Sequence, residues 1–174
     1  MVHVSKNITI KNSPEEVYRF WRHLENLPRF MHHLEDVRVV DEARSHWVVN
    51  APGGRVEWDA EITEDVPSER LAWHSINGAE IENRGIVRFR PAPADRGTEV
   101  QVDVYYSAPG GAAGVAIARL FGEEPLQQIR DDLRRFKQVM ETGEVVRSEG
   151  SLEGAGQGAL NQRKAQAAGK GDRR

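Results

Sequence analysis

A strand-like alternation that turns directly into a capped helix opens the chain and restricts its fold more than any other feature. Apolar and polar residues alternate over Val2–Ile10, a period typical of a half-buried strand. Ser13 then supplies a helix cap, Pro14 suits the first helical position, and Glu16 completes a capping box. One helical face follows, made of Val17, Phe20, Trp21 and Leu24. Pro28 restarts the chain, and a second short helix is predicted with an apolar face of Leu27, Phe30, Met31 and Leu34.

The pattern changes to a period of two from Val37 to Tyr106, which predicts six further strands. In the clearest of them, apolar and charged residues alternate, as in an antiparallel sheet with one face in water. Asn77-Gly78 predicts a hairpin turn. The strands are expected around Val37–Val39, Trp47–Ala51, Arg55–Thr63, Arg70–Ile76, Ile81–Phe89 and Val100–Tyr106. The last two carry complementary charges that favour their pairing, namely Arg84, Arg88 and Arg90 against Glu99 and Asp103.

A single apolar stripe predicts a helix of about four turns that begins near Pro125 and ends at Thr142-Gly143. Its members are Leu126, Ile129, Leu133, Phe136 and Met140. A glycine-rich break at Pro109–Gly114 and a short helix over Val115–Phe121 are expected before it. Residues 144–174 contain no aromatic residue and are rich in Gly, Ala and Gln, so we expect a disordered tail with a basic end.

Composition excludes several classes of function. The net charge of −3, with charges of both signs, favours neither nucleic acid nor an anionic membrane as a partner. The chain has no cysteine, which rules out disulfides, thiolate metal sites and cysteine nucleophiles. No secretory signal is evident, and no apolar run reaches the roughly 18 residues that a membrane span needs. We therefore expect a cytoplasmic protein without a membrane span.

The order of elements, taken with several short motifs, resembles the START-like (SRPBCC) superfamily of helix-grip proteins. The nearest likeness is to the polyketide cyclase/dehydrase group, which includes coenzyme-Q-binding START proteins. It rests on Ser13–Trp21, Asn26–Met31, Ala72-Trp73, Gly85–Phe89, Gly97–Val100 and Asp132–Lys137. The resemblance covers residues 1–143 and implies one α+β domain. In such a domain a curved seven-stranded antiparallel sheet surrounds a long C-terminal helix, and two short helices follow the first strand.

Proteins of this superfamily hold an apolar ligand between the inner face of the sheet and the long helix. The matching sheet positions are Trp58, Ile62, Trp73, Asn83, Val87, Phe89, Val102 and Tyr106, and the matching helix positions are Leu126, Ile129 and Leu133. The resemblance also implies that Gly110–Gly114 lies near the cavity mouth. Trp58 and Trp73 could provide a surface on which a flat ring of the ligand stacks, or they could simply pack in the core. Asn83 and Tyr106 suit either a ligand or a partner in the protein or solvent.

No set of reactive groups stands out among the other polar residues. The six histidines show no metal-ligand spacing, and we predict neither a metal nor another cofactor. His74 next to Trp73 and the row Glu57, Asp59, Glu61 are expected on the outer face of the sheet.

Three functions remain open, of which binding of an apolar or polycyclic molecule such as a polyketide, quinone or lipid is favoured. A metal-free polyketide aromatase/cyclase or dehydratase that uses the same cavity is the alternative. A protein-interaction module without a ligand, whose tail contacts a partner, is the third. Binding is favoured because catalysis needs polar groups that the sequence does not display.

Overall fold

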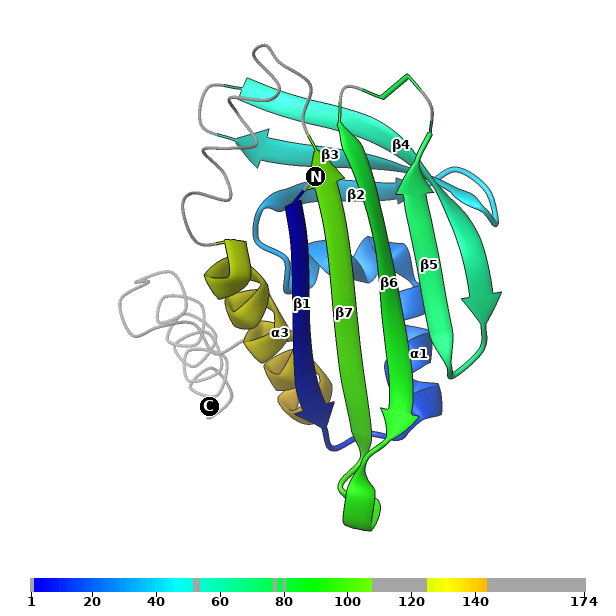
Figure 1. The fold of residues 1–174 in the computed structure, drawn as a ribbon, viewed down its shortest axis with the longest axis vertical. Helices are drawn as coiled ribbons and strands as arrows, with labels where there is room; N and C mark the ends of the chain where they lie inside the picture. Colours follow the sequence, from blue (N-terminus) through cyan, green and yellow to red (C-terminus); the bar gives the residue numbers. More distant parts are fainter. Residues whose placement is uncertain (1, 52–53, 77, 80, 108–124, 144–174) are drawn as a thin grey trace, which may run out of the picture.

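The computed structural model describes residues 2–51, 54–76, 78–79, 81–107 and 125–143, and their strands form one antiparallel sheet of seven. Its order is β1-β7-β6-β5-β4-β3-β2, and Figure 1 shows α1 and α3 on the same face of it. The strands are β1 (Val2–Ile10), β2 (Leu34–Val39), β3 (Arg44–Ala51), β4 (Gly54–Val66), β5 (Arg70–Ser75), β6 (Glu82–Pro91) and β7 (Thr98–Ser107). The helices are α1 (Pro14–Arg22), η1 (Leu24–Arg29), η2 (Pro93–Asp95) and α3 (Pro125–Thr142). The predicted α+β helix-grip fold is confirmed.

The connections explain why the helices lie on one face. Strands β2 to β7 pair each with the next along the chain, so this part of the sheet is a meander. Strand β1 instead pairs with β7, and it therefore lies at the edge opposite β2. The chain must cross from one edge of the sheet to the other between β1 and β2. Helices α1 and η1 make this crossing and cover the inner face.

The capped helix at the start of the chain is confirmed with one difference. Ser13 Oγ accepts the Glu16 N–H at 3.3 Å, as the cap predicts. The Glu16 carboxylate, however, accepts from Asn12 Nδ2 at 3.1 Å, so it bonds a side chain rather than closing the box on the backbone. The second helix is a 3₁₀ segment that contains Pro28 and ends at Arg29. The predicted extension to Leu34 is wrong, because Leu34 pairs with Val49 and begins β2.

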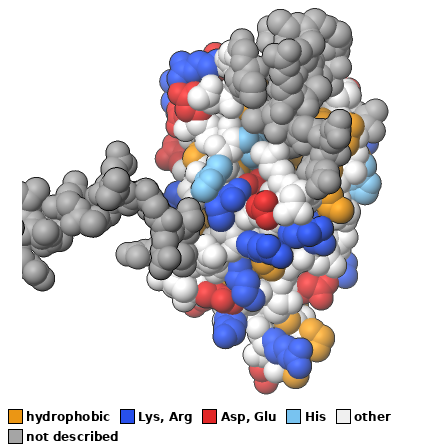
Figure 2. Space-filling model, turned by 90° about the vertical axis from the view of Figure 1, so that its left-hand side faces the viewer, with side chains coloured by type: hydrophobic (Ala, Val, Ile, Leu, Met, Phe, Trp, Pro, Cys, Tyr) orange, Lys and Arg blue, Asp and Glu red, His pale blue; other side chains and the backbone are white. Residues whose placement is uncertain are grey.

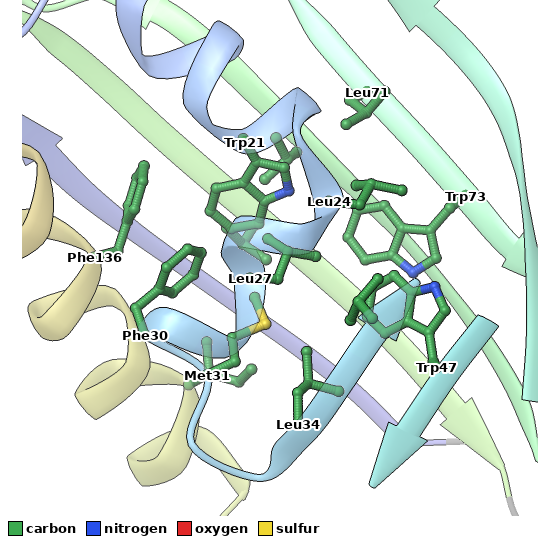
Figure 3. Packing of buried hydrophobic residues seen from close by; sticks show 14 of the residues in the cluster. Trp21, Leu24, Leu27, Phe30, Met31, Leu34, Trp47, Leu71, Trp73 and Phe136 are labelled. Atoms are coloured by element: carbon green, nitrogen blue, oxygen red, sulfur yellow. The ribbon is translucent and has the colours of Figure 1, made fainter. Parts of the chain in front are cut away.

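Three aromatic side chains from three segments join the helices over the sheet (Figure 3). Trp21 on α1, Phe30 after η1 and Phe136 on α3 are all fully buried. The ring centroids of Phe30 and Phe136 lie 4.8 Å apart, and those of Trp21 and Phe136 lie 5.1 Å apart in an edge-on arrangement. This cluster fixes the position of α3 relative to the N-terminal helices.

The predicted pairing of neighbouring strands and most of the charge pairing are confirmed. Asn77 of the predicted Asn77-Gly78 turn lies outside the described residues. Arg88 forms an ion pair with Asp103 at 3.2 Å across β6 and β7, and Arg90 lies opposite Glu99. The third arginine differs, because the Arg84 guanidinium lies over the Tyr105 ring, 4.7 Å from its centroid.

Two features of the sheet and of α3 depart from the expected pattern. Strand β4 is longer than predicted, and its pairing with β5 shifts register between Ile62 and Glu64. On α3, Ile129, Leu133 and Phe136 are buried, but Leu126 is 43% exposed, so its expected orientation toward the sheet is wrong.

The remaining predictions for the C-terminal part cannot be compared with the fold. The glycine-rich break, the short helix over Val115–Phe121 and the tail over 144–174 lie outside the described residues. None of the described helices is long and apolar enough to cross a membrane. Figure 2 shows the side of the molecule that carries α3 and β1, where Lys and Arg side chains lie among Asp and Glu and hydrophobic side chains are scattered.

Candidate functional site

An apolar cavity lies between the inner face of the sheet and the first turns of α3. Its volume is about 50 Å³. Strands β3 to β7, the segment before β2 and helix α3 all contribute to its wall. The lining residues are Met31, His33, Leu34, Trp47, Val49, Trp58, Trp73, Ile81, Asn83, Val104, Tyr106 and Ile129.

Three tryptophans from neighbouring strands form one wall of this cavity. The rings of Trp47 and Trp58 lie 5.9 Å apart and those of Trp47 and Trp73 lie 6.3 Å apart, with interplanar angles of 24° and 19°. Figure 3 shows the indoles of Trp47 and Trp73 side by side above Leu34. Gly85 makes room for this wall, because a Cβ there would lie 2.3 Å from Trp73 Cζ2. The Trp47 indole therefore lies nearly parallel to both of its neighbours.

The indole N–H groups of these tryptophans differ in their partners. Trp47 Nε1 donates to Ser45 Oγ at 2.8 Å, and Trp73 Nε1 donates to Asn83 Oδ1 at 3.1 Å. Trp58 Nε1 is buried and has no acceptor among the described residues. A buried donor without a partner costs about 1–3 kcal/mol, and ordered water or a ligand is its usual explanation.

The structure brings five of the eleven predicted site residues to the cavity and places the others elsewhere. The five are Trp58, Trp73, Asn83, Tyr106 and Ile129. Four more are buried in the core without lining the cavity, namely Val87, Phe89, Val102 and Leu133. Ile62 is half-buried beside the core, next to the register shift in β4, and Leu126 is exposed.

The two polar side chains that the sequence singled out are both at the cavity. The carboxamide of Asn83 is held by the Trp73 indole, and its backbone N–H donates to Ser75 Oγ at 2.9 Å. Asn83 thus has a partner within the protein, which is one of the two alternatives that the sequence left open. Tyr106 is 8% exposed, and burial raises the pKa of its phenol above the ordinary value.

A buried polar cluster next to the cavity was missed by the sequence analysis. His33 Nδ1 lies 3.1 Å from Gln128 Nε2 and 3.6 Å from Asp132 Oδ2. Asp132 is 1% exposed and pairs with Arg135, which also donates from Nε to the Phe30 carbonyl at 2.9 Å. These contacts join the segment before β2 to α3.

Burial determines the protonation of both titratable groups in this cluster. It lowers the pKa of His33 to about 4, and the positive charge of Arg135 adds to this effect. It raises the pKa of Asp132 to about 7, against the opposing effect of Arg135. The imidazole is therefore neutral near pH 7, and a large fraction of the Asp132 carboxyl group is protonated.

One signal in the sequence points to Asp132. It lies three residues after Ile129 and four before Phe136, so helical spacing places this carboxylate within the apolar stripe. An acidic residue in such a stripe is rarely buried unless it has a partner or a function. His33 carries no comparable signal, since it lies in a turn next to a second histidine, His32.

The outer face of the sheet holds the carboxylates that were expected there. His46 Nδ1 lies 2.8 Å from Asp59 Oδ1, and His74 Nε2 lies 3.7 Å from Glu61 Oε2. An open depression of about 720 Å³ beside them is lined by polar and charged groups that include His46, Arg55 and Glu57. In the part of the chain that the structure describes, no three His, Asp or Glu side chains are arranged to hold a metal ion.

The curved sheet, the two helices on its inner face and the buried apolar cavity define a helix-grip fold of the START-like type. Residues 10–134 match the family model of polyketide cyclase/dehydrase and lipid transport proteins, and the chain belongs to this family.

Individual relatives agree with this assignment. A 17.2 kDa protein from the melC2–rnhH intergenic region of Streptomyces lincolnensis is 31% identical over 141 residues, which are 81% of this chain and 91% of the relative. The crystal structure of DR_A0006 from Deinococcus radiodurans is 46% identical, with a TM-score of 0.69 over 82% of this chain and 99% of that one. A START superfamily protein from Mycobacterium smegmatis, 16% identical, shares the fold with a TM-score of 0.60 over 80% of this chain and 97% of that one.

Proposed function

We propose that this protein binds a small apolar molecule that carries a flat ring, in the cavity between the sheet and α3. The wall of three nearly parallel tryptophans carries the proposal. Protein interiors are close-packed, and a core that served only stability would fill this space. Membership of a family that includes lipid transport proteins supports the same conclusion.

The size of the cavity sets a condition on binding. Its volume of about 50 Å³ compares with about 30 Å³ for one water molecule and roughly 300–1,000 Å³ for common ligand sites. A ring therefore enters only if lining side chains move. Met31 is suited to this movement, because its unbranched side chain repacks at low cost.

Extraction of the purified full-length protein with organic solvent, followed by mass spectrometry, tests the proposal. We expect an apolar ring compound near one equivalent, and quenching of tryptophan fluorescence when naphthalene is added to the extracted protein. Val104→Phe would fill the cavity and weaken naphthalene binding at least about tenfold, an effect of about 1.4 kcal/mol. Val39→Phe, at a 40% exposed position, is the matched control. No extracted compound together with no quenching would refute the proposal.

A metal-free aromatase/cyclase or dehydratase is the second candidate. It is favoured by the three polar side chains that line the apolar cavity, His33, Asn83 and Tyr106, because confinement beside a few polar groups is what such a reaction needs. Turnover of poly-β-ketone mimics is the test. Equal rates with the wild type, with Val104→Phe and without protein would exclude this function.

A further inference from the structure

The first half of β4 has a partner strand on one side only. Residues Gly54–Glu61 pair with β3, whereas the pairing with β5 begins at Ala60. One further backbone bond on the β5 side runs from the Ile76 N–H to the Asp59 carbonyl at 2.8 Å. Figure 1 shows β4 continuing past the end of β5. The stretch Gly54–Trp58 is therefore an open strand edge.

Two residues of this edge present their backbone polar groups to the open side. The Asp59 carbonyl points toward the β5 side, and backbone groups of alternate residues in a strand point the same way. The N–H and C=O groups of Glu57 and Arg55 therefore face the open side, and no described residue bonds them. Unpaired groups of this kind are a template for a further strand.

The depression of about 720 Å³ on the outer side of the sheet lies along this edge. Arg55 and the stretch Glu57–Asp59 line it, together with Ile76 and Ala79 from the segment after β5. Its volume falls within the range of roughly 300–1,000 Å³ that is common for ligand sites. A strand advances about 3.4 Å per residue, so an extended segment of about five residues matches Arg55–Asp59 in length.

The charged groups along the edge leave one carboxylate weakly paired. Arg55 Nε donates to Glu35 Oε2 at 3.1 Å, and Asp59 Oδ1 lies 2.8 Å from His46 Nδ1. The Glu57 side chain is 51% exposed, and its ion-pair contact is His46 Nε2 at 3.9 Å. The outer side of the edge therefore favours a positively charged neighbour at Glu57.

We propose that the open edge of β4 binds an extended peptide segment of a partner protein, which adds a strand to the sheet and places a lysine or arginine opposite Glu57. Backbone hydrogen bonds supply the attraction in this mode, and alternate side chains supply the specificity. The residues on either side of the basic one point to the other face, where Trp58 and Ile76 offer apolar surface. This interaction is separate from ligand binding in the inner cavity.

An NMR titration of the ¹⁵N-labelled protein at pH 7.5 tests the proposal with two peptides, acetyl-Thr-Val-Lys-Val-Thr-amide and its analogue with Glu in place of Lys. We expect the lysine peptide to shift the backbone amide signals of Arg55 and Glu57. The analogue should bind at least about fivefold more weakly, because like charges directly opposite on paired strands repel. No shift of these two signals at millimolar lysine peptide, or equal affinity for both peptides, would refute the proposal.

Strand addition makes a second prediction that attraction between side chains does not. In the bound peptide the lysine N–H faces the β4 edge, and the N–H groups of the two valines face away from it. N-methylation of the lysine should therefore weaken binding at least about tenfold, whereas N-methylation of the first valine should change it by less than about threefold. Equal losses for the two methylated peptides would contradict strand addition, whatever any protein variant does.

A charge reversal in the protein locates the basic residue. Glu57→Lys should invert the preference between the two peptides, and Glu69→Lys, at an exposed position in the turn between β4 and β5, is the matched control and should keep it. A dimer in solution that Glu57→Lys dissociates would show that a second copy occupies the edge and would overturn the proposal. Naphthalene quenching reports the inner cavity separately, so failure of peptide binding leaves the proposed function intact.

Discussion

At the residue scale, individual buried side chains determine the chemistry beside the cavity. Asp132 is 1% exposed within the apolar stripe of α3, and it forms an ion pair with Arg135. A buried carboxyl group of this kind lowers stability when it ionises. Its position next to His33 therefore makes folding depend on pH through two groups with opposite effects.

We predict that the two groups oppose each other in the wild type. The folded state raises the pKa of Asp132 from 3.8 to about 7, so this group favours folding at low pH and loses its contribution as pH rises through 7. The folded state lowers the pKa of His33 from 6.5 to about 4, so this group destabilises the fold as pH falls below 6.5.

Removing one group should expose the effect of the other. For Asp132→Asn, the free energy of unfolding should rise between pH 4 and 6.5, and for His33→Leu it should fall between pH 4 and 7, each by roughly 1–3 kcal/mol. Urea unfolding over this pH range measures both. Parallel profiles for the two variants would contradict the prediction.

Gly85 is the residue on which the tryptophan wall depends most directly. Gly85→Ala would place a methyl group 2.3 Å from Trp73 Cζ2, inside the contact distance of the ring. Overpacking of this kind costs about 1–3 kcal/mol, so we expect a lower urea midpoint and a changed tryptophan emission. Trp73→Phe in the Gly85→Ala background should recover part of the loss. Unchanged stability of the alanine variant would show that the ring has room to move.

At the scale of elements, polar contacts in the C-terminal half of α3 join it to the N-terminal segment. Lys137 Nζ donates to the Thr9 carbonyl at 2.8 Å, and the Lys11 N–H donates to Glu141 Oε1 at 3.0 Å. Arg135 joins the same helix to Phe30 before β2. Helix α3 therefore touches both ends of the N-terminal segment, and the cavity lies beside its first turns.

The cap of α1 gives a prediction at this scale. Ser13→Ala removes the acceptor of the Glu16 N–H and should lower the free energy of unfolding by about 1 kcal/mol. Asn7→Ala is the control, because it also truncates a small polar side chain to alanine, at an exposed position on β1. Chemical denaturation followed by circular dichroism measures both. Equal effects would mean that the cap contributes nothing specific.

At the scale of the whole molecule, the sheet and the helices on its inner face account for the described core. The buried hydrophobic residues form one cluster that reaches from β1 to α3. We propose that residues 1–143 form the folded domain. The later residues contain few apolar side chains with which to add to this core.

Deletion of residues 144–174 should therefore leave the unfolding temperature within about 2 °C of that of the full chain. It should also leave naphthalene binding unchanged. Thermal unfolding and fluorescence titration of the full and shortened chains provide the comparison. A loss of several degrees would show that the C-terminal residues belong to the domain.

Much of the fold was predictable because its signals are local. Alternation placed the strands, and the cap at Ser13 and the stripe from Ile129 to Phe136 placed the main helices. The end of η1 and the orientation of Leu126 could not be predicted, because each depends on a contact with a distant segment. Leu34 leaves the predicted helix to pair with Val49, and the buried part of α3 begins at Ile129.

The sequence by itself predicted the strands, the main helices and the inward-facing Trp58 and Trp73, because periodicity decides which side of a strand or helix is apolar. The helix-grip architecture was implied by the resemblance to a known superfamily. Only the tertiary structure decided the chemistry of the cavity. His33 and Asp132 are almost 100 residues apart in the chain and lie 3.6 Å apart in the fold. Their protonation depends on burial by both segments at once, and no local pattern of residue types encodes that distance.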